Sequence, residues 1–101
     1  MLELPVIEVE HYTDKLFRIQ TERPRSYRFT AGEFVMIGLE DAPNRAYSIT
    51  SGPYHDYIEF YSIKVQDGPL TSKLQHVKVG DTIRVGEKPT GTLILANLEL
   101  G

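Results

Sequence analysis

The sequence contains no cysteine, and this absence narrows its chemistry. Without thiols there is no disulfide framework, no thiolate zinc site, no iron–sulfur ligation and no cysteine nucleophile. No unbroken apolar run exceeds four residues, as in Phe34–Ile37, whereas a membrane-spanning helix needs about 20. The start of the chain, Met1–Pro5, carries no basic stretch ahead of an apolar one, so we expect no secretory signal and a cytoplasmic location. The 101 residues suffice for one domain.

Positive charge is also scarce, since 11 Lys and Arg stand against 14 Asp and Glu, a net charge of −3. This balance disfavours nucleic acid as a partner, because phosphate binding depends on clustered cations. Arg23, Arg25 and Arg28 nevertheless form a local cluster, which we interpret first as solvated surface and second as a docking site for an acidic protein. A β-barrel module that binds oligonucleotides or proteins stays open as an alternative, supported by these arginines and the aromatic residues Tyr54, Tyr57, Phe60 and Tyr61.

Familiar catalytic and phosphate-binding motifs are missing. The histidines, His11, His55 and His76, lie far apart without a carboxylate at metal-ligand spacing, so no metal site is predicted. No Gly-x-Ser-x-Gly elbow occurs. No two glycines stand two positions apart, which excludes the dinucleotide fingerprint Gly-x-Gly-x-x-Gly.

Period-two alternation predicts short antiparallel strands. Ile7 and Val9 alternate with glutamates, and Phe17 and Ile19 alternate with more polar residues. Leu70, Leu74 and Val77 recur instead at helical spacing, which predicts one short helix over about residues 69–77. Together these patterns indicate an all-β barrel with one helix. The remaining predicted strands are Glu33–Leu39, Ala46–Thr50, Tyr57–Val65, Thr82–Val85 and Thr92–Leu95, separated by turns such as Ala31-Gly32, Asp41–Asn44 and Val79–Asp81.

The tetrapeptide Arg45-Ala46-Tyr47-Ser48 carries the clearest binding signal. On a strand, Arg45 and Tyr47 project to one face, so that a guanidinium for phosphate oxygens stands beside a ring for stacking. Ser48 follows on the other face or edge. Taken alone, the tetrapeptide is better explained by an ordinary edge strand with a solvated Arg45 and a half-buried Tyr47.

A second candidate element is Asp67–Leu74, where Thr71, Ser72 and free backbone amides are expected in the first turn of the predicted helix. Helix N-termini attract phosphate groups, although Thr71 or Ser72 serving as a simple cap is the alternative. Between the two elements lies Glu59–Val65, in which Tyr61 has a ring suited to stacking a base, while Phe60 is expected in the core.

Three motifs carry a resemblance to the FAD-binding domain of the bacterial ferredoxin (flavodoxin)–NADP+ reductases: in chain order they are Phe29–Leu39, Arg45–Ser51 and Glu59–Leu74. The resemblance covers nearly the whole chain, and Asp67–Leu74 is its most discriminating part, since Arg-x-Tyr-Ser is shared by many flavoreductases. Glu33 and Gln66 depart from the usual pattern, at positions without a proposed ligand contact. The resemblance implies a six-stranded antiparallel Greek-key barrel with one capping helix and FAD along its outside.

The resemblance also implies roles for individual residues. Arg45 would contact the pyrophosphate, while Tyr47 would stack on the isoalloxazine ring and Ser48 would lie near N5, so these last two are the catalytic candidates. Tyr61 would lie against the adenosine half, in a groove that residues 62–65 would line largely through their backbone. Residues 69–72 would bring the helix N-terminus to the pyrophosphate. The expected cofactor-binding residues are Arg45, Ala46, Tyr47, Ser48, Tyr61, Ser62, Ile63, Lys64, Val65, Pro69, Leu70, Thr71 and Ser72.

Members of the family continue into a second domain that binds NADP(H), and we expect residues 1–101 to be only the FAD-binding part of such an enzyme. The implied reaction moves electrons between NADP(H) and ferredoxin or flavodoxin through FAD, with no membrane partner. Alone, the chain is expected to be inactive and to show weak or absent retention of FAD. A flavoreductase domain that uses FAD or FMN and serves an oxygenase is the alternative within the superfamily.

Overall fold

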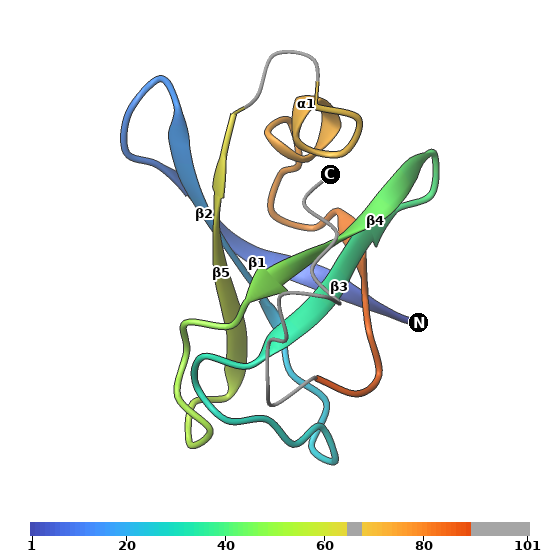
Figure 1. The fold of residues 1–101 in the computed structure, drawn as a ribbon. Helices are drawn as coiled ribbons and strands as arrows, with labels where there is room; N and C mark the ends of the chain where they lie inside the picture. Colours follow the sequence, from blue (N-terminus) through green and yellow to red (C-terminus); the bar gives the residue numbers. More distant parts are fainter. Residues whose placement is uncertain (65–67, 90–101) are drawn as a thin grey trace.

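The computed structural model describes residues 1–64 and 68–89, and six antiparallel strands form one curved sheet (Figure 1). In the sheet the strands follow the order β4-β3-β6-β1-β2-β5. Because β6 is inserted between β1 and β3, the connections cross the ends of the sheet, as a Greek-key barrel requires. The elements are β1 Leu2–His11, β2 Leu16–Glu22, β3 Phe34–Leu39, β4 Ala42–Ser48, β5 Tyr57–Ile63, α1 Thr71–Leu74 and β6 Thr82–Val85.

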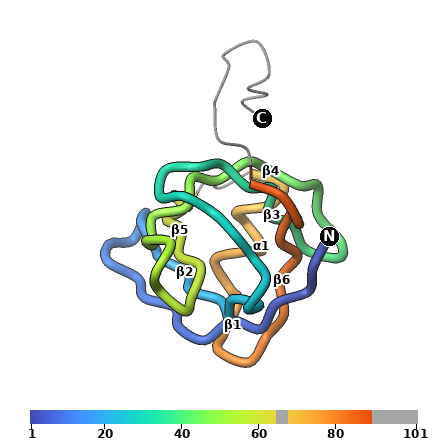
Figure 2. The backbone as a smooth tube through the Cα atoms, turned by 90° about the horizontal axis from the view of Figure 1, so that it is seen from below, coloured from blue at the N-terminus to red at the C-terminus, as the bar shows by residue number. Residues whose placement is uncertain are grey.

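The sheet curls around a single apolar core, so the predicted all-β barrel with one short helix is confirmed. Seen from below, the backbone forms a ring with α1 inside its outline (Figure 2). Leu70, which precedes α1, and Leu74, its last residue, are fully buried and close one end of the core. Among the described residues, no helix is long and apolar enough to cross a membrane. The largest buried side chains include Phe17, Ile19, Ile37, Ile49, Ile58, Phe60 and Ile83.

Strand β1 follows the predicted alternation only in part, because a bulge interrupts it. The register with β2 shifts between Val6 and Glu8, which leaves Ile7 as the extra residue. Val6 is buried, but Ile7 is 40% exposed, so the prediction that Ile7 faces the core is wrong. The bulge lets β1 pair with β6 through its first residues and with β2 through its later ones.

Two predicted boundaries also need correction. Strand β4 begins at Ala42 rather than Ala46, because Leu39 pairs directly with Ala42 and the hairpin loop is short. Pro43 is tolerated since β4 is an edge strand. The α-helical segment is only Thr71–Leu74, flanked by turns, and is therefore shorter than the predicted 69–77. The predicted strand at Thr92–Leu95 and the end of the one at Tyr57–Val65 lie outside the described residues.

The edge strands β4 and β5 form the seam of the barrel. They approach each other beyond the end of β4 and diverge toward α1 (Figure 1). The amide of Thr50 donates to the carbonyl oxygen of Glu59 at 2.8 Å, and the amide of Glu59 donates to the Ser51 hydroxyl at 3.0 Å. The barrel is thus joined at one end of the seam, and the ends of β4 and β5 become neighbours.

Candidate functional site

Strand β4 places the predicted tetrapeptide on both faces of the sheet. Tyr47 pairs with Val35 and Arg45 with Ile37, and both partners are buried, so Tyr47 and Arg45 are on the core side of the edge strand. Ala46 and Ser48 are on the outer side. The predicted juxtaposition of a guanidinium and a phenol on one face is therefore present, with Ser48 on the other face as expected.

Tyr47 is half-buried at the seam and is held by two residues of β5. Its hydroxyl lies 3.0 Å from the Ser62 hydroxyl, and its ring centroid lies 5.2 Å from that of Phe60 at an angle of 45°. Burial raises the pKa of the Tyr47 phenol, although the Ser62 hydrogen bond and the charge of Arg45 act in the opposite direction. The phenol is therefore neutral at physiological pH and able to donate a hydrogen bond.

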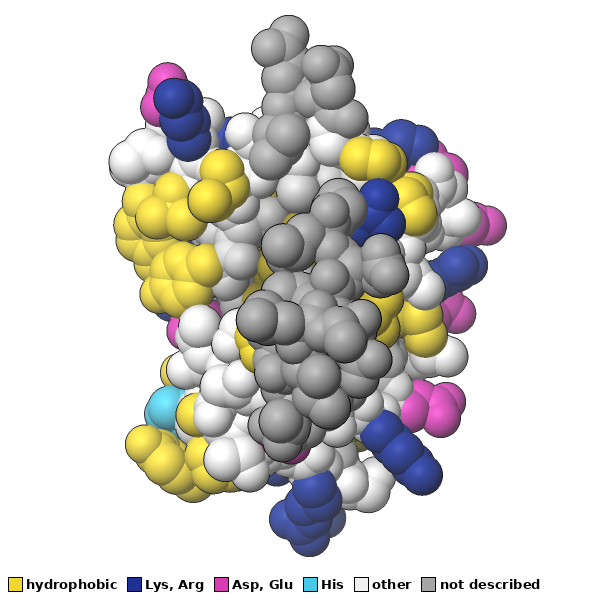
Figure 3. All heavy atoms as spheres, viewed as in Figure 1, with side chains coloured by type: hydrophobic (Ala, Val, Ile, Leu, Met, Phe, Trp, Pro, Cys, Tyr) yellow, Lys and Arg dark blue, Asp and Glu magenta, His cyan; other side chains and the backbone are white. Residues whose placement is uncertain are grey.

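Strand β5 separates its candidate residues between two faces. Phe60 and Ser62 are buried toward the core, which confirms the core role of Phe60, whereas Tyr61 and Ile63 are 40% and 61% exposed on the outer face. Tyr61 packs against Tyr12 of β1's flanking turn, with ring centroids 6.0 Å apart. Figure 3 shows hydrophobic side chains gathered on the side of the molecule where β2 and β5 lie. Tyr61 therefore does not join Tyr47, and its contact with adenosine stays a prediction.

The remaining residues predicted on this segment are Lys64 and Val65. Lys64 is partly exposed, and its amide donates to the carbonyl of Lys15 at 2.6 Å. Val65 lies outside the described residues. The backbone of residues 62–65 is expected to line a binding groove, but the Lys64 amide is already hydrogen-bonded within the protein. It connects the end of β5 to the turn before β2.

The segment around α1 differs from the predicted helix terminus. Pro69 is exposed, Leu70 is buried, and Thr71 and Ser72 are partly exposed. The Ser72 amide donates to the Gly68 carbonyl at 3.1 Å, and no side-chain hydrogen bond caps the helix. The expectation of free amides is therefore wrong for Ser72, and a single helical turn carries little dipole. Contacts of Pro69–Ser72 with a pyrophosphate stay a prediction.

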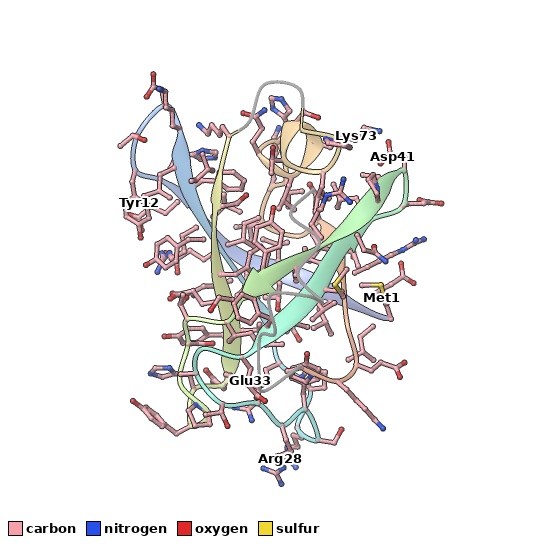
Figure 4. The ribbon with its side chains drawn as sticks, in the orientation of Figure 1. Met1, Tyr12, Arg28, Glu33, Asp41 and Lys73 are labelled. Carbon is pink, nitrogen blue, oxygen red and sulfur yellow. The ribbon has the colours of Figure 1, made fainter. Side chains whose placement is uncertain are left out.

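An ion pair that the sequence analysis missed braces α1 against the β3–β4 hairpin. Lys73 Nζ donates to Asp41 Oδ2 at 2.8 Å and to the Asp41 carbonyl at 2.9 Å, and Figure 4 shows the two residues side by side. The hydrogen bond from Lys73 lowers the pKa of Asp41. No local pattern signals this contact, because the residues lie 32 positions apart.

The arginine cluster divides into one structural residue and two exposed ones. Arg23 donates through Nε to the Tyr27 carbonyl at 2.9 Å and through a terminal nitrogen to the carbonyls of Pro53 and His55, and its guanidinium lies 4.5 Å from the Phe29 ring centroid. The interpretation of Arg23 as solvated surface is therefore wrong. Arg25 and Arg28 are exposed, and Arg28 lies at the end of the barrel opposite α1 (Figure 4). The three arginines border a surface depression of about 260 Å³.

Glu59 anchors a second network that the sequence analysis missed. Its carboxylate accepts hydrogen bonds from Gln20 Nε2 at 2.7 Å, Thr50 Oγ1 at 2.8 Å and Arg18 at 3.2 Å. Burial raises the pKa of Glu59, but the hydrogen bonds from Gln20 and Thr50 and the charge of Arg18 outweigh it, so the net pKa is lowered. This network fixes the position of Thr50 and therefore of the segment that follows the end of β4 at Ser48.

The donor set at the seam fits a ligand that combines phosphate and a flat ring. Arg45 supplies a permanent positive charge, Tyr47 supplies an aromatic face with a fixed hydroxyl, and Ser48 supplies a hydroxyl on the neighbouring position. Within residues 1–64 and 68–89, no three His, Asp or Glu side chains gather into a possible metal site.

Comparison with known proteins identifies the family of the chain. The family model described as the oxidoreductase FAD-binding domain matches residues 4–94. The chain belongs to this family. The matched range contains every residue of the predicted site and nearly the whole of the barrel.

The individual proteins that the chain resembles are reductases. The chain is 52% identical to ferredoxin–NADP reductase A of Sorangium cellulosum and 54% identical to the ferredoxin–NADP reductase of Azotobacter vinelandii, over 98% and 92% of its own length. It spans 37% of each of these relatives. A solved ferredoxin NADP+ reductase from Neisseria gonorrhoeae, with FAD and NADP bound, superposes with a TM-score of 0.85 at 36% identity, over 94% of this chain and 40% of that one.

Proposed function

We propose that residues 1–101 are the FAD-binding part of a ferredoxin or flavodoxin–NADP+ reductase, and that an NADP(H)-binding part belongs to the same enzyme. The relatives that support this proposal are reductases of that name, and the chain covers about a third of their length. The proposal includes ferredoxin or flavodoxin as the redox partner and a cytoplasmic location. The single observation that carries it is the placement of Arg45 and Tyr47 on one face of an edge strand, with the phenol fixed at the seam.

The chain's own residues bind and orient the cofactor. Arg45 binds the pyrophosphate through charge-assisted hydrogen bonds, and Tyr47 packs its ring on the isoalloxazine. Ser48, which follows Tyr47 on the other face of the edge strand, would offer its hydroxyl to the reactive edge of the flavin. Bound FAD supplies the redox chemistry, exchanging electrons between a hydride donor and a one-electron carrier. None of these residues needs to act as a general acid or base, because the protein contributes position and electrostatics.

Titration of the chain with FAD tests the proposal. Arg45→Ala is expected to raise the dissociation constant about tenfold or more, since a charge-assisted hydrogen bond contributes about 1.5–3 kcal/mol. The visible spectrum of bound flavin should change little, because Arg45 is assigned to the phosphate and not to the ring. Arg25→Ala, which removes an exposed arginine outside β4, is the matched control. Equal affinities for the two variants would contradict the assignment of Arg45.

The rival functions give different outcomes in the same titration. Because residues 1–101 supply one wall of the proposed flavin site, we expect weak FAD retention, and a yellow protein with tight stoichiometric flavin would contradict this. A labelled oligonucleotide that binds more tightly than FAD would favour the nucleic-acid-binding module. Engagement of Arg23 by backbone carbonyls already weakens that alternative. Acceptor assays on the full reductase would separate ferredoxin or flavodoxin from an oxygenase component.

A further inference from the structure

Ser62 stands out on β5 because its polar side chain points toward an apolar core. The inward positions of the strand are Ile58, Phe60 and Ser62, and Ser62 is only 4% exposed. A hydroxyl at such a position is unfavourable unless it is hydrogen-bonded. Its partner is Tyr47 Oη at 3.0 Å, on the opposite side of the seam.

The two contacts of Tyr47 with β5 restrict different motions of its side chain. Packing against the fully buried Phe60, with the rings inclined at 45°, limits displacement of the Tyr47 ring. The hydrogen bond to Ser62 fixes the far end of the same ring. Because a tyrosine side chain has only two principal rotations, these two contacts suffice to fix the plane of the ring.

We infer that Ser62 is a positioning residue, whose hydroxyl holds the Tyr47 ring across the β4–β5 seam in the orientation that receives the flavin. This inference rests on the proposed function and deepens it. It differs from the expectation that Ser62 lines a groove through its backbone, because here the side chain acts through Tyr47. Rigidity set before binding lowers the ordering cost on association, so the hydrogen bond contributes to affinity without touching the ligand.

The first measurement needs no flavin. Tyrosine labelled at Cζ reports the ionisation of each phenol by NMR, and Tyr47→Phe identifies the Tyr47 signal. The hydrogen bond with Ser62 lowers the pKa of this phenol and so opposes the effect of burial, and Ser62→Ala is expected to move the Tyr47 titration to higher pH. Ser62→Thr keeps a hydroxyl and should restore the original midpoint. Ser26→Ala, at an exposed serine outside the seam, serves as the control.

The second measurement is FAD titration of the same variants. Ser62→Ala is expected to weaken FAD binding about threefold to tenfold, as the loss of one ordinary hydrogen bond does, and to reduce the quenching of flavin fluorescence. Ser62→Thr should recover most of the affinity. In the Tyr47→Phe background, Ser62→Ala should have little further effect, because the hydroxyl pair is already broken.

The outcomes separate this inference from the proposal beneath it. An unchanged Tyr47 titration in Ser62→Ala, or an unchanged FAD affinity while Arg45→Ala still loses affinity, overturns the role of Ser62 and leaves the proposed function standing. Absence of saturable FAD binding by the unaltered chain overturns both. A loss in Ser62→Ala that persists in full in the Tyr47→Phe background also overturns the inference, because Ser62 would then act independently of Tyr47.

Discussion

Arg23 should be the arginine of its cluster on which folding depends. Its guanidinium connects the chain after β2 with the loop between β4 and β5 through the carbonyls of Tyr27, Pro53 and His55. The bonds to Tyr27 and His55 are partly buried, and each contributes about 1–1.5 kcal/mol. The contact with the Phe29 ring adds about 0.5–1 kcal/mol. We therefore expect Arg23→Ala to lower the free energy of unfolding by about 3 kcal/mol.

A loss of this size is large against the roughly 5–15 kcal/mol by which domains are stable. It should lower the melting temperature of a chain of this length by more than about 10 °C. Urea unfolding followed by far-UV circular dichroism and by tyrosine fluorescence measures it, since the chain has six tyrosines and no tryptophan. Lysine keeps the charge but not the planar fork, so Arg23→Lys should recover only a minor part of the loss.

The control variants make the prediction specific. Arg25→Ala and Arg28→Ala remove the same charge from exposed positions nearby and should change stability by less than about 0.5 kcal/mol. If Arg23→Ala unfolds at the same urea concentration as these two, the carbonyl contacts of Arg23 contribute nothing measurable, and the assigned structural role is refuted.

Three further predictions follow from the packing and charge of the fold. Leu74→Ala should destabilise the domain by about 2–5 kcal/mol, because Leu74, the last residue of α1, is fully buried; a chemical denaturation midpoint close to the original would contradict its role in closing the core. Glu59 has a lowered pKa, so its stabilising contribution is complete above the ordinary value of 4.5 and disappears as the pH falls through the lower folded value; Glu59→Gln should flatten the stability–pH curve below pH 4.5, and parallel curves would refute this. Lys73→Ala should cost no more than about 1 kcal/mol, because both partners of the Lys73–Asp41 pair are largely exposed, and that cost should shrink in high salt; an equal cost at all salt concentrations would argue against the ion pair.

Local patterns predicted the strands that obey simple alternation and the turns that need glycine. Phe17 and Ile19 are fully buried as expected, and Gly32 and Gly80 adopt positive φ values of 91° and 98° in predicted turns. Strand β4 was predicted four residues too late, because Pro43 and Asn44 resemble loop residues. Only the sheet order, which makes β4 an edge, explains why they are tolerated.

The site was predictable where it is local and not where it depends on contacts across the barrel. Alternation alone placed Arg45 and Tyr47 on one face, since that requires only the geometry of one strand. The partner of Tyr47 is Ser62, 15 residues away on the opposite edge, and no spacing rule connects them. Arg23 resembled its two neighbours in sequence, and only the fold brings the carbonyls of another loop within its reach.

The bulge at Ile7 has a consequence for insertions and deletions. Val6 and Val9 are on the core side of β1 and Glu8 is on the outer side, so the chain with Ile7 removed would read as an uninterrupted alternation. Deleting this one residue would leave the other side chains of the strand on their present faces. What would be lost is the bend by which a single strand serves both β6 and β2. Ile7 is thus not needed to bury the core side chains of β1, but it is needed for the bend of the strand. A protein that lacked Ile7 would keep its hydrophobic pattern, and its sheet would be flatter.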